Sequence, residues 1–123
     1  SRKQFGVPLA DFQTIAFTLA DMAVDHQAAA LLLKEAADLL DAGLPAGPAC
    51  SMAKLFASEA SIRNTSRAVQ ILGGAGYIRG VLAERLYRDA RITTIYEGTS
   101  EIQRLIISRD LIHGSGSATR SAP

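Results

Sequence analysis

An apolar residue recurs every three or four positions across residues 9–42, and neither glycine nor proline interrupts that stretch. This spacing predicts one amphipathic α-helix of about 50 Å, at about 1.5 Å per residue. Pro8 suits the first turn of such a helix, and Gly43 is well placed to end it. A helix of this length favours a bundle with neighbouring helices. Its predicted inward positions are Phe12, Ile15, Leu19, Met22, Ala29, Leu33 and Leu40.

Three more helical segments follow a breaker cluster at residues 44–48. The first of them should pack antiparallel to the long helix and end at the glycine-rich residues 73–76. Residues 81–90 are typical of a short helix and residues 99–112 of a last one, and no strand is predicted. The fold class is therefore all-α, an antiparallel helical bundle. Predicted inward positions of the last helix are Ile102, Leu105, Ile106 and Ile112.

One helical domain over residues 1–113 is expected, because 123 residues with 48% hydrophobic content supply a single compact core. Residues 114–123 are polar and glycine-rich. Too few apolar side chains lie there to offset the entropy lost on ordering, so these residues are expected to form a flexible tail.

Charge and composition narrow the classes of partner. Thirteen basic and twelve acidic residues give a net charge of +1, which offers no electrostatic reason to expect a nucleic acid or an anionic membrane. No apolar run approaches the roughly 20 residues of a membrane span, so a soluble protein is expected. Cys50 is the only cysteine, which precludes an internal disulfide and fits a reducing compartment.

Glu97 is the candidate catalytic residue, because it lies in a predicted turn between two helices, beside the apolar Ile95 and Tyr96. Desolvation there would favour the protonated carboxyl group and make Glu97 a useful general base, while Gly98 would let another molecule approach the backbone. A solvated or helix-capping glutamate is the competing interpretation.

Other motifs give no independent site. The glycines of residues 73–80 lack the third glycine of a dinucleotide fingerprint and follow a helix, so they indicate a helix end that also permits close approach of a ligand. No serine is arranged with a histidine and an acid for nucleophilic catalysis, and no histidine pair has metal-binding spacing. A metal site is therefore not predicted.

Five motifs occur in one order along residues 2–112, and together they resemble the C-terminal helical domain of flavin-dependent acyl-CoA dehydrogenases. The motifs are RKQFG with PL and FQ at residues 2–13, MAK at 52–54, AVQILGGAGY at 68–77, ERLYRDARI at 84–92, and IYEGTSEIQ at 95–103. The resemblance implies that FAD takes a hydride from the β-carbon of an acyl-CoA while a glutamate removes the α-proton, which yields a trans-2-enoyl-CoA. Glu97 matches that glutamate.

The resemblance also implies which residues bind cofactor and substrate. One segment reaches the FAD diphosphate across a subunit interface, a second contacts the adenosine half, and a third lies beside the flavin. Tyr96 and Gly98 are the implied substrate contacts, with Gly98 at the thioester. The implied cofactor-binding residues are Arg2, Lys3, Gln4, Phe12 and Gln13 in the first segment, Gln70, Ile71, Leu72, Gly73 and Gly74 in the second, and Thr99, Ser100 and Glu101 in the third.

This resemblance covers only part of the family's enzyme, whose N-terminal helical domain and middle β-domain precede the matching region. The chain alone is therefore expected to bind FAD weakly and to be inactive without those domains or a partner subunit. An electron-transferring flavoprotein, homo- or hetero-oligomers, and the bacterial cytoplasm or mitochondrial matrix are implied as partner, assembly and location. The alternative is a non-catalytic helical oligomerisation or regulatory module.

Overall fold

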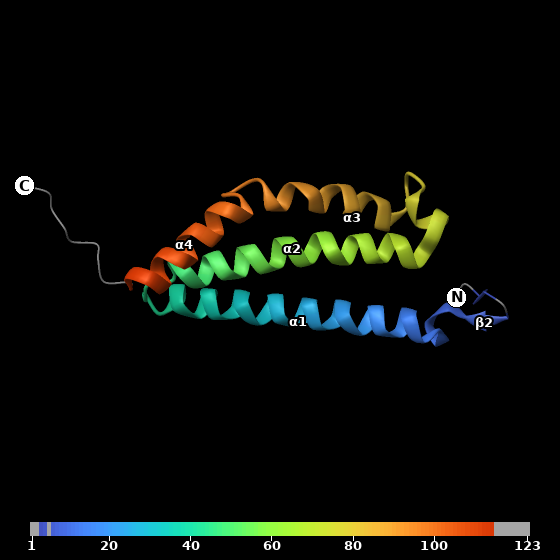
Figure 1. The fold of residues 1–123 in the computed structure, drawn as a ribbon, viewed down its shortest axis with the longest axis horizontal. Coiled ribbons are helices and arrows are strands. Elements are labelled where there is room, and N and C mark those ends of the chain that lie inside the picture. The colour runs from blue at the N-terminus through green and yellow to red at the C-terminus, as the bar shows by residue number, and fades with distance from the viewer. Residues whose placement is uncertain (1–2, 5, 115–123) are drawn as a thin grey trace, which may run out of the picture.

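The two long helices form an antiparallel pair in the computed structural model, which describes residues 3–4 and 6–114. Helix α1 spans Gln13–Asp41 and helix α2 spans Gly47–Leu72, and they lie side by side (Figure 1). The chain reverses between them after Gly43, whose φ of 66° is in the left-handed region that glycine adopts without strain. The antiparallel pairing predicted from the sequence is therefore confirmed.

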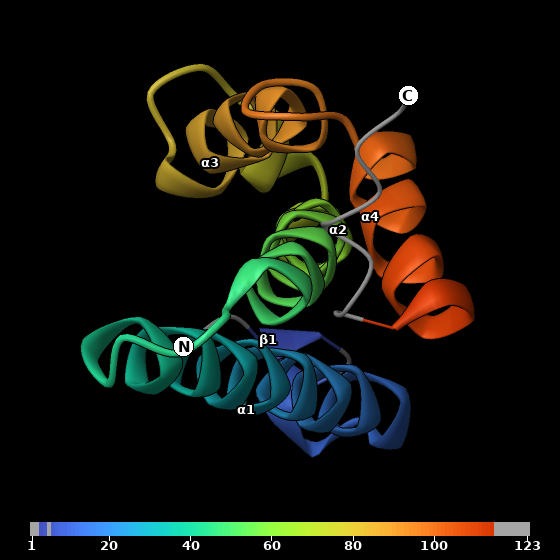
Figure 2. The ribbon, with the colours of Figure 1, turned by 90° about the vertical axis from the view of Figure 1, so that its left-hand side faces the viewer.

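Helix α2 is the central element of the bundle. Figure 2 shows it surrounded by α1, α3 and α4, and it packs against all three. A 3₁₀ turn at Gly73–Tyr77 follows α2 and leads to α3 (Leu82–Ala90). A second 3₁₀ turn at Arg91–Thr94 then leads through a bend to α4 (Ser100–His113). The all-α fold class is confirmed.

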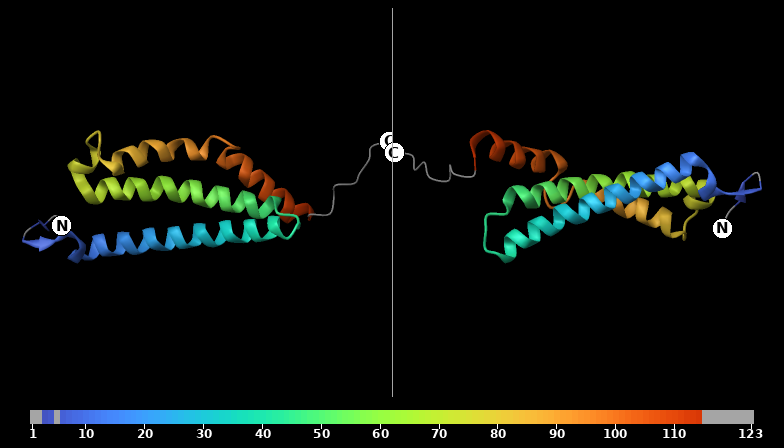
Figure 3. Two further views of the ribbon diagram at one scale, coloured as in Figure 1. Left: turned by 180° about the vertical axis from the view of Figure 1, so that it is seen from behind. Right: turned by 90° about the horizontal axis from the view of Figure 1, so that it is seen from below.

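The start of the chain differs from the prediction of one helix over residues 9–42. Two short strands, β1 (Lys3–Gln4) and β2 (Val7–Pro8), pair antiparallel beyond the N-terminal end of α1 (Figure 3). A 3₁₀ turn at Leu9–Asp11 follows, and Phe12 is extended, with ψ of 122°. The prediction of no strand was therefore wrong. Pro8 was also expected in the first turn of the helix, but it lies in β2 with an extended ψ of 141°.

Small side chains make up the core, which consists largely of alanines and serines where helices meet. Leu33 is 64% exposed and Ile112 is 73% exposed, although both were predicted to face inward. The periodicity identified an apolar face correctly but not what covers it, and much of that face is open here. The other predicted inward residues that are exposed are Leu19, Leu40, Ile102, Leu105 and Ile106.

Two further expectations concern the surface and the end of the chain. Among the described helices, none combines the length and hydropathy needed to cross a membrane. The predicted flexible tail begins at Gly114, and the rest of it, residues 115–123, lies outside the described residues. The boundary at residue 113 coincides with the end of α4 and otherwise stays a prediction.

Candidate active site

Glu97 lies in the bend between the 3₁₀ turn at Arg91–Thr94 and α4, as the sequence predicted. Its φ is 54°, and no other non-glycine residue in the described part of the chain has a positive φ. Such a conformation costs about 1–3 kcal/mol and persists only where the surrounding structure enforces it. Gly98 follows with φ of 87°. The backbone at the candidate base is therefore strained.

Two polar side chains hold the carbonyl groups of this turn. The Lys54 ammonium group of α2 donates to the Gly98 carbonyl oxygen, with 2.5 Å between the nitrogen and the oxygen. The Gln103 amide of α4 donates to the carbonyl oxygens of Glu97 and Gly98, at 3.2 and 3.3 Å. Gln103 is only 6% exposed, so these bonds are shielded from water. We call the segment of Glu97 and Gly98 that these two side chains hold the Glu97 turn.

Helix α4 begins directly after the turn. The Thr99 hydroxyl accepts a hydrogen bond from the Ile102 amide at 3.3 Å and so caps the helix. Hydrogen bonds from its own backbone amide and from the Thr99 hydroxyl lower the pKa of the Glu101 carboxyl group below its ordinary value. The positive end of the α4 dipole therefore lies two residues after Glu97.

A pocket of about 510 Å³ is lined by residues on both sides of Glu97. Ser100 lines it, and the Ser100 hydroxyl is buried without a hydrogen-bond partner within the described residues. A buried hydroxyl without a partner is rare in native proteins and indicates that a further polar group belongs beside it. The full lining is Glu59, Ile62, Arg63, Arg91, Thr94, Ile95, Thr99, Ser100 and Glu101.

The expected burial of Glu97 is absent from this chain by itself. Glu97, Ile95 and Tyr96 are all exposed. The apolar neighbours were expected to shield the carboxylate, but the bend turns them outward. Any dry environment around Glu97 must therefore come from groups that cover the turn.

Residues near the end of α2 line a second pocket, of about 550 Å³. Gln70, Ile71 and Gly73 contribute to it together with Leu9 and Thr14, which flank Phe12 and Gln13 in sequence. Leu72 and Gly74 are exposed nearby, and a Cβ atom added at Gly74 would meet nothing within 4 Å. The segments predicted to bind two parts of the cofactor thus lie at one end of the molecule.

This second pocket is distant from the Glu97 turn within one chain. Lys54 and Gln70 are 16 positions apart on α2, or about 24 Å along the helix axis. Of the remaining predicted contacts, Phe12 is half-buried, Gln13 is exposed at the start of α1, and Lys3 is exposed in β1. Gln4 also lies in β1, and Arg2 lies outside the described residues.

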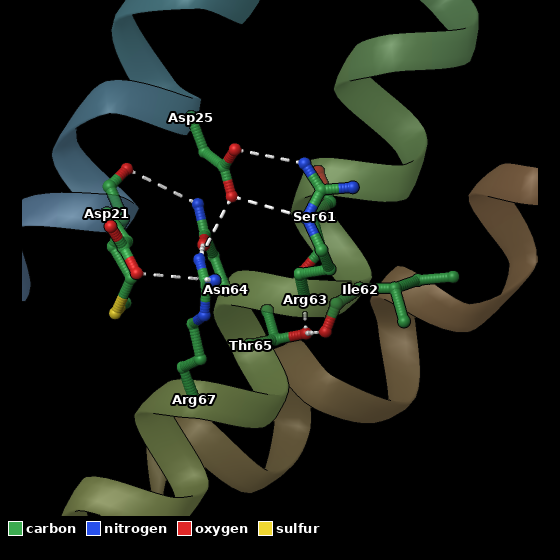
Figure 4. Close-up of polar contacts among 9 residues, drawn as sticks. Asp21, Asp25, Ser61, Ile62, Arg63, Asn64, Thr65 and Arg67 are labelled. Atoms are coloured by element: carbon green, nitrogen blue, oxygen red, sulfur yellow. Dashed lines mark hydrogen bonds and ion pairs between the residues drawn. The ribbon is translucent and has the colours of Figure 1, made fainter. Parts of the chain in front are cut away.

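An ion-pair cluster fixes α1 against α2 between these two sites (Figure 4). The Asp25 carboxylate accepts hydrogen bonds from Arg63 at 3.0 Å and from Arg67 at 3.1 Å. Arg67 also lies 3.8 Å from Asp21. The hydrogen bond from Arg63 and the charges of both arginines lower the pKa of Asp25 despite its burial. We call these four residues the Asp25 cluster.

Sequence reasoning missed Lys54 and Gln103 as members of the site. Lys54 was part of a recognised motif, yet nothing local links it to Gly98, 44 residues later. Gln103 gave no signal either, because the predicted inward face of the last helix did not include it, and its burial beside Ser100 is seen only in the structure. Within residues 3–4 and 6–114, no three or more His, Cys, Asp or Glu side chains gather closely enough to hold a metal ion.

Comparison with known proteins gives a consistent result. The family model described as the C-terminal domain of acyl-CoA dehydrogenase matches residues 1–112. An acyl-CoA dehydrogenase of Bacillus subtilis is 54% identical over 114 residues, which cover 93% of this chain and 30% of that relative. The human mitochondrial short-chain specific acyl-CoA dehydrogenase is 54% identical over 112 residues, which cover 91% of this chain and 27% of that relative.

The fold agrees with a solved structure, butyryl-CoA dehydrogenase from Megasphaera elsdenii. The TM-score is 0.90 at 44% identity, and the match covers 91% of this chain and 29% of that one. The chain thus spans less than a third of the length of the relatives it matches. The family model matches nearly the whole chain, and the fold agrees with that of a solved relative. This protein therefore belongs to the acyl-CoA dehydrogenase family and corresponds to its C-terminal domain.

Proposed function

We propose that this chain supplies the catalytic base and part of the cofactor site of an FAD-dependent acyl-CoA dehydrogenase. The enzyme oxidises an acyl-CoA to a trans-2-enoyl-CoA. The observation that carries the proposal is the strained Glu97 turn, whose backbone carbonyl groups are held directly before the N-terminus of α4 and between residues that line a pocket. Backbone strain of this kind concentrates at functional sites.

The residues around the first pocket fit a flavin. The orphaned Ser100 hydroxyl offers a donor and an acceptor, and Thr99 and Glu101 flank it on the same helix turn. FAD, when bound, supplies the acceptor for the hydride of the substrate β-carbon. Thr99, Ser100 and Glu101 are the residues of this site that would hold it.

Glu97 performs the proton step. Its carboxylate takes the α-proton of the acyl-CoA, and the electron pair of that C–H bond becomes part of the new α,β double bond as the β-hydrogen leaves as hydride. Gly98 and Tyr96 are proposed to lie against the substrate, because they border the base and Gly98 lets the thioester approach the backbone. Negative charge develops on the thioester oxygen as the α-proton leaves. A dipole that points at this oxygen stabilises the charge and so makes the α-proton acidic enough to transfer.

The exposure of Glu97 defines what the rest of the enzyme must do. A base for carbon acids works best in a site from which water is excluded. Because the turn and the outer faces of α1 and α4 are open here, the proposal assigns their covering to the remaining domains of the family, to FAD and to substrate. The chain alone is accordingly proposed to bind FAD weakly and to turn over poorly.

The second pocket is proposed to serve another subunit. Gln70 to Gly74 would contact the adenosine half of FAD, and the segment containing Lys3, Gln4, Phe12 and Gln13 its diphosphate. Their distance from the Glu97 turn along α2 supports a contact made across a subunit interface in a homo- or hetero-oligomer. An electron-transferring flavoprotein as electron acceptor, and the bacterial cytoplasm or mitochondrial matrix as location, complete the proposal.

Replacement of the base tests this function. Glu97→Gln in the FAD-loaded enzyme that contains this chain keeps the shape of the side chain but removes the proton acceptor. We expect kcat to fall at least about 100-fold, since a general base contributes about 10²–10⁴-fold, while flavin content stays unchanged. Glu35→Gln, which changes an exposed glutamate of α1, is the matched control. Dye reduction by acyl-CoA measures both, and unchanged turnover in Glu97→Gln would refute the proposal.

A non-catalytic oligomerisation or regulatory module is the second candidate. The observation that favours it is the row of exposed apolar side chains on α1, among them Phe17, Val24 and Leu31. This candidate predicts that the purified native protein assembles with other chains and yet contains no FAD. Flavin absorbance of that protein separates the two candidates.

A further inference from the structure

We propose that Lys54 and Gln103 are positioning residues for the reaction, and that they hold the Glu97 carboxylate in the direction that proton abstraction requires. The inference rests on the proposed function, because that function makes Glu97 the base. Neither side chain needs to touch substrate. Both act through the backbone carbonyl groups of Glu97 and Gly98.

Lys54 anchors the turn to the central element of the bundle. It lies within α2, the helix against which α1, α3 and α4 all pack. Its ammonium group donates to the Gly98 carbonyl oxygen at 2.5 Å, and a charged donor makes this bond about twice as strong as a neutral one. The side chain is half-buried, so solvent screens the bond less than at the surface.

Gln103 holds the same turn from α4. Its buried amide group donates to two successive carbonyl oxygens, those of Glu97 and Gly98. A Cβ atom at residue 98 would lie 2.7 Å from the Gln103 amide nitrogen, so this approach depends on glycine at that position. Gly98 and Gln103 therefore form one unit, in which the missing side chain of the first makes room for the second.

The backbone held in this way is the one that aims the base. The two carbonyl groups belong to the peptide units that follow Glu97 and Gly98, so fixing them restrains the left-handed conformation at Glu97. A glutamate released from these bonds returns to the ordinary region of negative φ, which swings its Cα–Cβ bond away. Proton transfer is sensitive to such displacement, since about 1 Å of misplacement costs about 100-fold in rate.

The test uses Lys54→Met and Gln103→Met in the FAD-loaded enzyme that contains this chain. Methionine keeps most of the volume and removes the donor. We expect kcat to fall about 10- to 100-fold, with KM and flavin content within about twofold of the wild-type values. With substrate deuterated at the α-carbon, the isotope effect on kcat should grow, because proton abstraction becomes the slow step. Lys54→Arg, which keeps a charged donor, should recover most of the rate.

Lys34→Met is the matched control, because Lys34 is an exposed lysine of α1 that pairs only locally with Asp38. It should leave kcat and the isotope effect unchanged. A fall in kcat that merely follows lost flavin, with an unchanged isotope effect, would overturn the inference by showing a structural role. Unchanged kcat in both methionine variants would also overturn it. If Gln103→Met yields no loaded enzyme, the Lys54→Met and Lys54→Arg pair decides.

Failure of the inference is distinguishable from failure of the proposed function. If Glu97→Gln is inactive while Lys54→Met and Gln103→Met are fully active, only the positioning role is refuted and Glu97 remains the base. If turnover survives in Glu97→Gln, Glu97 is not the base, and Lys54 and Gln103 then have no base to position.

Discussion

The Glu97 turn and the segment from Gln70 to Gly74 are both candidate functional regions at the end of a helical stretch, but they are held very differently. The turn is strained, and side chains of α2 and α4 fix its carbonyl groups. In the second segment Gln70 and Gly74 are exposed, and open space surrounds Gly74. The first region is organised within this chain, whereas the second offers a surface that another molecule must complete.

Alanine substitutions of one glycine in each region should give the largest difference in stability between the two regions. Gly98→Ala strains the backbone at a φ of 87° and places a Cβ atom 2.7 Å from the Gln103 amide nitrogen, which must shift and lose its hydrogen bonds, so the protein should be destabilised by about 2–3 kcal/mol. Gly74→Ala meets open space and an ordinary φ, and loses entropy mainly from the unfolded chain. It should be neutral or stabilise by up to about 1 kcal/mol.

Chemical denaturation of the two purified variants measures the difference. Equal destabilisation by both alanines would mean that the two regions are equally constrained, which contradicts the comparison.

The Asp25 cluster borders both regions, because Arg63 lines the first pocket and Asp21 and Arg67 line the pocket that contains Gln70. Asp25→Asn removes a carboxylate that accepts from two arginines, and we expect a loss of about 1–2 kcal/mol at pH 7. The pKa of Asp25 is lowered in the folded protein, so its contribution is complete above the ordinary value of 3.8 and disappears as the pH falls through the folded-state value.

Unfolding curves of wild type and Asp25→Asn should therefore converge in acid. A difference that stays constant down to pH 2 would show that packing, and not the ionised carboxylate, explains the effect.

The smallest expected effect concerns the cap of α4. The Glu101 carboxyl group has a lowered pKa because its own backbone amide and the Thr99 hydroxyl donate to it. Glu101→Gln should reduce the melting temperature slightly at neutral pH, less than Asp25→Asn does. The reduction should begin to shrink as the pH falls below the ordinary value of 4.5 and should vanish below the folded-state pKa, where the native carboxyl group is protonated as well. Melting temperatures of both proteins across that pH range check the sign.

The sequence allowed accurate prediction of what local chemistry determines. Gly43 and Gly73 end helices with left-handed φ values, as their residue type indicates. The outward position of Leu33 was not predictable, because periodicity shows which residues share a face but not whether a neighbour covers it. The bond from Lys54 to Gly98 joins positions 44 residues apart, and such pairing depends on how helices assemble.

The candidate site likewise has features that could be predicted from the sequence and features that could not. Glu97 could be located from a turn between two helices and from the family motif, because both are contiguous in sequence. Its exposure could not, since the bend directs Ile95 and Tyr96 outward. The strand pair at Lys3–Gln4 and Val7–Pro8 was missed because two-residue strands leave no alternation to detect.

Hydrogen exchange at the substrate α-carbon tests the central claim most directly. The FAD-loaded enzyme that contains this chain is incubated without an electron acceptor in deuterium oxide together with an acyl-CoA, and deuterium at the α-carbon is measured by mass spectrometry. The account predicts that the wild-type enzyme incorporates deuterium there and that Glu97→Gln does not, while Glu35→Gln behaves as wild type. Equal incorporation by wild type and Glu97→Gln would contradict the assignment of Glu97 as the base.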